Sequence, residues 1–85
     1  MRELQYIVMD ETGLHARPAG LLAKEASRFQ SEIRIKKGDK IADAKRIFSI
    51  MGLAVKQKEL ISITIEGEDE EEAFVAMGKC LKTNL

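Results

Sequence analysis

Three residues of this sequence could do chemistry together: its only histidine, His15, its only proline, Pro18, and Arg17 between them, in the stretch "TGLHARPAG". A neutral imidazole nitrogen is a nucleophile toward phosphorus and needs no separate base. A guanidinium can hold two phosphate oxygens at once in a fixed fork. This combination predicts that His15 accepts a phosphoryl group and that Arg17 contacts the phosphate.

A helix start is expected to support that group. The apolar residues that follow have the spacing of one face of a helix, which we place from Ala16 to about Gln30: Ala19, Leu22, Ala23, Ala26 and Phe29. Pro18 suits the first turn, where backbone N–H groups lack helical acceptors. We therefore expect Ala16 and Pro18 to form a phosphate-supporting helix start, at the positive end of the helix dipole.

The residues alone leave a second interpretation open, in which His15 is an ordinary exposed loop residue. A metal site is not expected, because there is no second histidine and the single cysteine, Cys80, is distant in sequence. No spacing pairs His15 with a serine or cysteine nucleophile. No cofactor is expected.

The order of elements predicts one domain over residues 1–85. Alternating or apolar segments predict strands at residues 4–9, 32–36, 41–44 and 60–65. A short helix is expected within 45–55 and a final helix after Asp69, which we place at its N-cap. The order β-α-β-β-α-β-α favours an α+β fold, with one antiparallel sheet and three helices on one face.

Charge is segregated along a chain whose net charge is zero. Residues 12–58 carry eleven Lys and Arg against four Asp and Glu, whereas residues 59–85 carry two against seven. The basic half contains His15, so it either attracts an acidic partner or is simply solvated. The strands lack stacking aromatic residues, so no nucleic-acid partner is expected. One cysteine, no signal peptide and no membrane span predict a cytoplasmic protein without membrane insertion, and we expect a monomer.

The motif "GLHARPAG" closely resembles the active-site motif of HPr, the histidine-containing phosphocarrier family of the bacterial sugar phosphotransferase system. The segments "AKRIF" and "GEDE", and the chain length, are also similar. The resemblance implies an open-faced β-sandwich with sheet order 1-4-2-3. It implies that His15 accepts phosphate from Enzyme I on its δ1 nitrogen and passes it to a IIA domain, with Arg17 contacting phosphate. A paralogue that serves a regulatory or nitrogen-related phosphorelay is the alternative.

The resemblance also implies a docking surface that includes the short second helix. In this sequence the helix offers Ile47, Phe48 and Met51 for partner binding, although one or two of these could belong to the core. Ile50 and Leu53 are better core candidates. Basic residues expected at the rim are Lys24, Lys40 and Lys45.

Many HPr proteins of low-GC Gram-positive bacteria carry a regulatory serine at the start of the second helix. Arg46 occupies that position here, and Ser49 does not match the motif. We therefore expect neither serine-kinase control at this position nor the co-repressor role that depends on it.

Overall fold

The computed structural model describes all residues from 1 to 85, and the predicted order of elements is confirmed. The elements are β1 (Arg2–Ile7), α1 (Ala16–Ala26), β2 (Glu32–Lys37), β3 (Lys40–Asp43), α2 (Ile47–Met51), β4 (Leu60–Glu66) and α3 (Glu70–Asn84).

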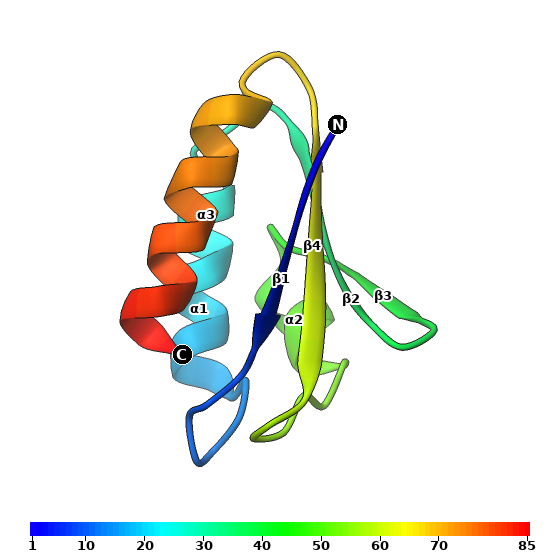
Figure 1. The fold of residues 1–85 in the computed structure, drawn as a ribbon, viewed down its shortest axis with the longest axis vertical. Coiled ribbons are helices and arrows are strands. Elements are labelled where there is room, and N and C mark those ends of the chain that lie inside the picture. The colour runs from blue at the N-terminus through cyan, green and yellow to red at the C-terminus, as the bar shows by residue number, and fades with distance from the viewer.

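The four strands form one antiparallel sheet in the order β1-β4-β2-β3 (Figure 1), as the family resemblance implied. Successive side chains of a strand point to opposite faces of the sheet. On β4, one of the two central strands, this alternation buries Ile61, Ile63 and Ile65 completely. Ile63 pairs with Leu4 of β1 on one side and with Ile35 of β2 on the other. These isoleucine side chains therefore form the part of the hydrophobic core that the sheet contributes.

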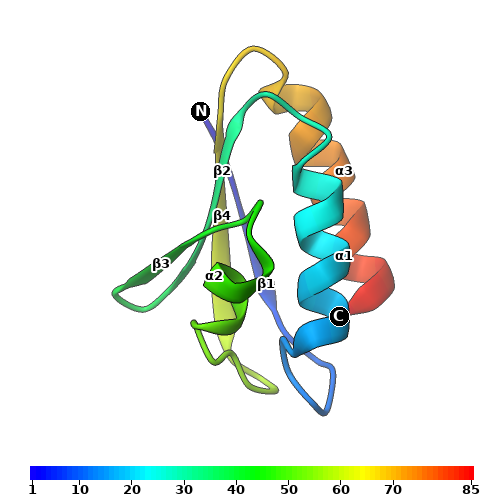
Figure 2. The same cartoon turned by 180° about the vertical axis from the view of Figure 1, so that it is seen from behind.

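Helices α1 and α3 lie side by side over one face of the sheet, while the other face is uncovered (Figures 1 and 2). Leu22 from α1 and Met77 from α3 are fully buried against the strands. The short helix α2 contacts α1 and β3. The packing places the beginning of α1 beside α2 at one end of the molecule.

Most strand boundaries differ by one or two residues from the sequence prediction, and two differences have a clear physical cause. Helix α1 ends at Ala26 rather than near Gln30, because the chain tightens there: the backbone N–H groups of Arg28 and Phe29 bond three residues back. Strand β1 ends at Ile7 rather than at residue 9. Val8 still lies in the core, but Met9 leaves the sheet and its N–H donates to the carbonyl of Leu85.

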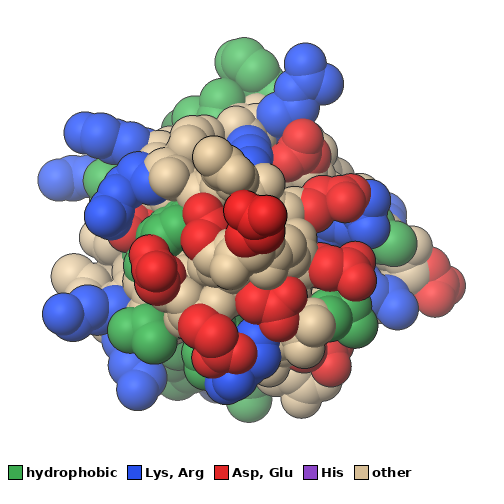
Figure 3. All heavy atoms as spheres, turned by 90° about the horizontal axis from the view of Figure 1, so that it is seen from above, with side chains coloured by type: hydrophobic (Ala, Val, Ile, Leu, Met, Phe, Trp, Pro, Cys, Tyr) green, Lys and Arg blue, Asp and Glu red, His purple; other side chains and the backbone are tan.

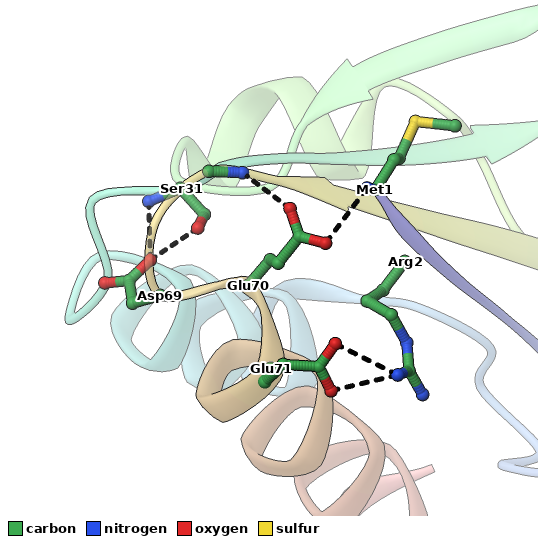
Figure 4. A network of polar contacts seen from close by, with 7 residues as sticks. Met1, Arg2, Ser31, Asp69, Glu70 and Glu71 are labelled. Carbon is green, nitrogen blue, oxygen red and sulfur yellow. Dashed lines mark hydrogen bonds and ion pairs between the residues drawn. The ribbon is translucent and has the colours of Figure 1, made fainter.

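Asp69 occupies the N-cap position of α3, as predicted, but its side chain does not cap the helix. Its carboxylate instead accepts a hydrogen bond from the backbone N–H of Gln30 at 2.8 Å. It also accepts hydrogen bonds from the backbone N–H (2.9 Å) and the hydroxyl of Ser31 (Figure 4). Next to it, Glu70 accepts from the Gly67 N–H at 3.1 Å and pairs with the amino group of Met1 at 2.9 Å. Asp69 thus joins the α1–β2 connection to the start of α3.

This network predicts that acid weakens the fold partly through Asp69. The hydrogen bonds from the Ser31 hydroxyl, followed by that from the Gln30 N–H, lower the pKa of Asp69 below its ordinary value. A lowered pKa in the folded state gives stability that is present above the unfolded pKa of about 3.9 and is lost as the pH falls through the folded pKa. Asp69→Asn should therefore lose less stability on acidification than the wild type, in urea unfolding between neutral and acid pH.

Glu68→Gln is the matched control, because Glu68 is an exposed neighbour. It should retain the acid response of the wild type. Equal acid responses in Asp69→Asn and the wild type would contradict the role given to Asp69.

Candidate functional site

The loop before α1 is held by a turn that begins at Asp10. The Gly13 N–H donates to the Asp10 carbonyl at 2.9 Å, and the Thr12 N–H donates to the Asp10 carboxylate at 2.8 Å. A side-chain oxygen that accepts from the N–H two residues on is the usual contribution of aspartate to a turn. The backbone of residues 10–13 is therefore fixed by its own hydrogen bonds.

Gly13 allows this loop to lie against the segment after α2. Its φ is +70°, and a Cβ at this position would lie 2.3 Å from the carbonyl oxygen of Val55. Only glycine meets both conditions without strain. The next residue, Leu14, is buried and its N–H donates to the same carbonyl oxygen at 2.9 Å. His15 follows directly, so its backbone position is set on both sides.

His15 is the N-cap residue of α1, with an extended backbone (φ −89°, ψ −169°). Its carbonyl accepts the Ala19 N–H at 3.0 Å, but its side chain makes no capping hydrogen bond. The imidazole is therefore not used to cap the helix. The N–H groups of Ala16 and Arg17 precede any intrahelical acceptor, and Pro18 has no N–H, so two donors remain at this end of the helix.

A shallow cavity of about 330 Å³ lies at this helix end. It is lined by Asp10, His15, Arg17, Pro18, Leu21, Thr83 and Asn84. The His15 side chain is 37% exposed, and its Nε2 lies 4.0 Å from Oδ1 of Asp10. The structure thus brings together His15, Arg17 and Pro18 of the predicted site, with exposed Ala16 beside them. A larger depression lies over β2 and β3 and contains neither His15 nor Arg17.

The cavity is also lined by residues that were not predicted from the sequence, namely Asp10, Leu21, Thr83 and Asn84. For Asp10 a signal existed, since it is a carboxylate five residues before the only histidine, across a turn. Thr83 and Asn84 reach the cavity only because the end of α3 packs beside the start of α1. No local pattern in the sequence predicts that the two helix ends lie close together.

The predicted partner-binding residues on α2 differ in exposure. Phe48 is 81% exposed and Met51 is 37% exposed. Ile47 is half-buried against the core, and its Cδ1 would lie 3.4 Å from a Cβ at Gly20 of α1. The core assignments of Ile50 and Leu53 are confirmed. An exposed apolar surface therefore lies on α2, adjacent to the first turns of α1.

The three predicted basic residues of the rim lie in different surroundings. Lys40 is exposed at the start of β3. Lys24 is exposed on α1. Lys45 is half-buried, and its ammonium donates to the Phe29 carbonyl at 2.8 Å, beyond the C-terminal end of α1. Lys45 thus has a structural partner, and its role in docking stays a prediction. Arg46 is the exposed N-cap residue of α2 and makes no side-chain capping bond.

The acidic segment lies at the opposite end of the molecule from His15. Six of the seven residues 66–72 are Asp or Glu. They lead into α3, which begins at the end far from the start of α1 (Figure 1). Figure 3 looks onto that far end and shows acidic side chains gathered over its middle. The molecule therefore presents a negative end away from the histidine.

Comparison with known proteins gives the family. Residues 2–83 match the family model described as the PTS HPr component phosphorylation site. The chain belongs to the HPr family. HPr from Lysinibacillus sphaericus, a phosphocarrier protein, is 42% identical over 81 residues, which are 95% of this chain and 92% of the relative.

Solved HPr structures share the fold. The HPr of Thermoanaerobacter tengcongensis superimposes with a TM-score of 0.92 at 40% identity, covering 99% of this chain and 94% of the other. The phosphocarrier HPr of Bacillus anthracis gives a TM-score of 0.85 at 41% identity, covering 94% and 95%. The protein is thus an HPr-type phosphocarrier of the phosphotransferase system. None of its helices has the length and hydrophobicity needed to cross a membrane.

Proposed function

We propose that the protein accepts a phosphoryl group from phosphorylated Enzyme I on Nδ1 of His15 and donates it to IIA domains of sugar permeases. It acts as a cytoplasmic carrier, as one HPr-like domain and as a monomer, and it needs no cofactor. The observation that carries the proposal is the position of His15. Its uncommitted imidazole stands at the start of α1, in an open cavity with Arg17.

The transfer step uses groups that are already in place. The Nδ1 lone pair forms the N–P bond, while the bond from phosphorus to the donor breaks and its electrons stay with the donor. The phosphoryl oxygens then accept hydrogen bonds from the N–H groups of Ala16 and Arg17 and from the Arg17 guanidinium. Pro18 stiffens the turn that presents these donors.

A carrier must also release its phosphate. At about 1.4 kcal/mol per tenfold change, an extra 3 kcal/mol of stabilisation would disfavour onward transfer by roughly a hundredfold. The shallow cavity, with one arginine and one helix end, meets this limit. Its open side leaves the phosphoryl group accessible to the next protein in the relay.

Docking is proposed to use the apolar surface of α2 together with the basic residues Lys24 and Lys45. Exposed Phe48 and Met51 provide the apolar contact, with Ile47 behind them. Methionine adapts to differently shaped partners, as a protein that meets both a donor and acceptors requires. Lys24 lies in the last turn of α1, and Lys45 bonds to the Phe29 carbonyl just beyond that turn. These basic side chains attract an acidic partner, whereas the acidic segment 66–72 repels it.

Phe48→Ala should weaken binding to Enzyme I roughly tenfold, mainly through faster dissociation, because an exposed aromatic anchor is lost. The free energy of unfolding should hardly change, since 81% of Phe48 is exposed. Binding kinetics on immobilised Enzyme I measure the first effect and urea unfolding the second. Val75→Ala, at an exposed apolar residue of α3, is the control. If both variants dissociate at the wild-type rate, α2 is not the docking surface.

Regulation by a serine kinase is not part of this proposal. Arg46 offers no hydroxyl at the start of α2, and its positive charge is opposite to that of a phosphate. The Ser49 hydroxyl accepts the Asp43 N–H at 2.9 Å and is half-buried, so it is engaged within the fold. The protein is therefore proposed to stay receptive to Enzyme I without serine control.

The proposal is tested by following the intact mass through one cycle. Enzyme I with phosphoenolpyruvate should add one phosphoryl group to the protein. Removal of Enzyme I followed by addition of a IIA domain should return the protein to its original mass. A protein that gains no phosphate, or that keeps it in the presence of several IIA domains, would contradict the proposed carrier role.

A further inference from the structure

The cavity at the start of α1 contains one acidic side chain, that of Asp10. Its Oδ1 lies 4.0 Å from Nε2 of His15, the ring nitrogen that is not proposed to take the phosphate. The same oxygen accepts the Thr12 N–H at 2.8 Å. The hydrogen bond within the turn therefore holds the carboxylate in the position where it faces the imidazole ring.

We propose that Asp10 is a positioning residue for phosphoryl transfer, whose carboxylate keeps the imidazole proton on Nε2 and leaves the lone pair on Nδ1. This inference rests on the proposed function of His15. The tautomer of a neutral imidazole is set by what faces each nitrogen. A carboxylate is an acceptor only and favours an N–H directed toward it. At 4.0 Å the pair is too far apart for a direct hydrogen bond, so the carboxylate acts through its charge.

The same carboxylate acts during the transfer itself. When Nδ1 forms the bond to phosphorus, the proton stays on Nε2 and the ring gains positive charge. The electrons of the broken bond remain with the donor, so no further acid or base is needed at this step. The negative charge of Asp10 then offsets the charge that develops on the ring.

The other lining side chains do not supply this effect. Arg17 is a cation and serves the phosphate side. The Asn84 side chain is a neutral amide, and its nitrogen donates to the Cys80 carbonyl at 2.9 Å. Thr83 carries no charge. Within the cavity, Asp10 is thus the side chain that can stabilise a positively charged imidazole.

Asp10→Asn removes the negative charge and keeps the side-chain oxygen that forms the turn. The amide oxygen can still accept the Thr12 N–H, so the loop should keep its shape and the unfolding midpoint should stay close to that of the wild type. The ¹⁵N NMR spectrum of the imidazole, recorded in mildly alkaline solution, should show a smaller Nε2–H population. The rate of phosphoryl acceptance from Enzyme I should fall about fivefold to tenfold.

Glu11→Gln is the matched control. It neutralises the neighbouring exposed carboxylate, which does not line the cavity, and should leave the tautomer ratio and the rate unchanged. An Asp10→Asn protein with the wild-type tautomer ratio or the wild-type rate would overturn the inference. Failure of the proposed function is distinguishable, because in that case the wild type itself takes up no phosphate.

Discussion

His15→Ala should abolish phosphoryl acceptance and leave the fold intact. The imidazole is the proposed nucleophile, and the cavity contains no second histidine or cysteine to replace it. The helix loses little, because the His15 side chain makes no capping hydrogen bond and the backbone carbonyl still accepts the Ala19 N–H. Intact mass after incubation with Enzyme I and phosphoenolpyruvate measures the loss. Urea unfolding should show a change within about 0.5 kcal/mol.

Ser49→Ala is the matched control for this experiment, because it removes a hydroxyl of α2 without touching the cavity. It should accept phosphate at full stoichiometry. If His15→Ala still gains one phosphoryl group, another residue is the acceptor and the site described here is wrong.

Gly13→Ala should cost about 2–4 kcal/mol of stability and slow phosphoryl transfer in the molecules that remain folded. The φ of +70° is unfavourable for a residue with a Cβ, and that Cβ would lie 2.3 Å from the Val55 carbonyl oxygen. The clash involves backbone, so no side chain can turn aside to relieve it. Relief requires the loop to move, and His15 moves with it. Urea unfolding and the rate of phosphoryl uptake measure the two effects.

Gly38→Ala is the control that introduces backbone strain without a steric clash. Gly38 also has positive φ, at +57°, but a Cβ there would meet nothing within 4 Å. The variant should lose roughly 1–2 kcal/mol, from the left-handed conformation alone, and transfer phosphate normally. If the two variants lose equal stability, contact with Val55 does not fix the loop.

The strands were predictable because the alternation of apolar and polar residues is a local feature of the sequence. Alternation of isoleucine with polar residues gives the buried face of β4 directly from the sequence. The boundaries were less accurate, since they depend on tertiary hydrogen bonds such as that from Met9 to Leu85. The role of Asp69 likewise depends on tertiary hydrogen bonds that the sequence does not show. Its position before a helix predicts a cap, but its carboxylate bonds to the distant residues Gln30 and Ser31.

The candidate site was predictable where its residues are contiguous. His15, Arg17 and Pro18 lie within one turn of helix, so their proximity follows from sequence spacing. The contributions of Thr83 and Asn84 depend on the packing of α3 beside α1. Asp10 is an intermediate case, because a turn brings it back toward His15. Phe48 was predicted to face solvent, and its exposure agrees, whereas Ile47 is drawn into contact with Gly20.

The central claim is that His15 carries the phosphoryl group, and the most direct measurement is to locate that group on the wild-type protein. After incubation with Enzyme I and phosphoenolpyruvate, the protein is digested at neutral to basic pH and its fragments are sequenced by mass spectrometry, beside a sample treated with acid. We predict a single phosphoryl group on His15 that is lost in acid and retained in base. A phosphoryl group on Ser49 or any other residue, or one that survives acid, would contradict the account.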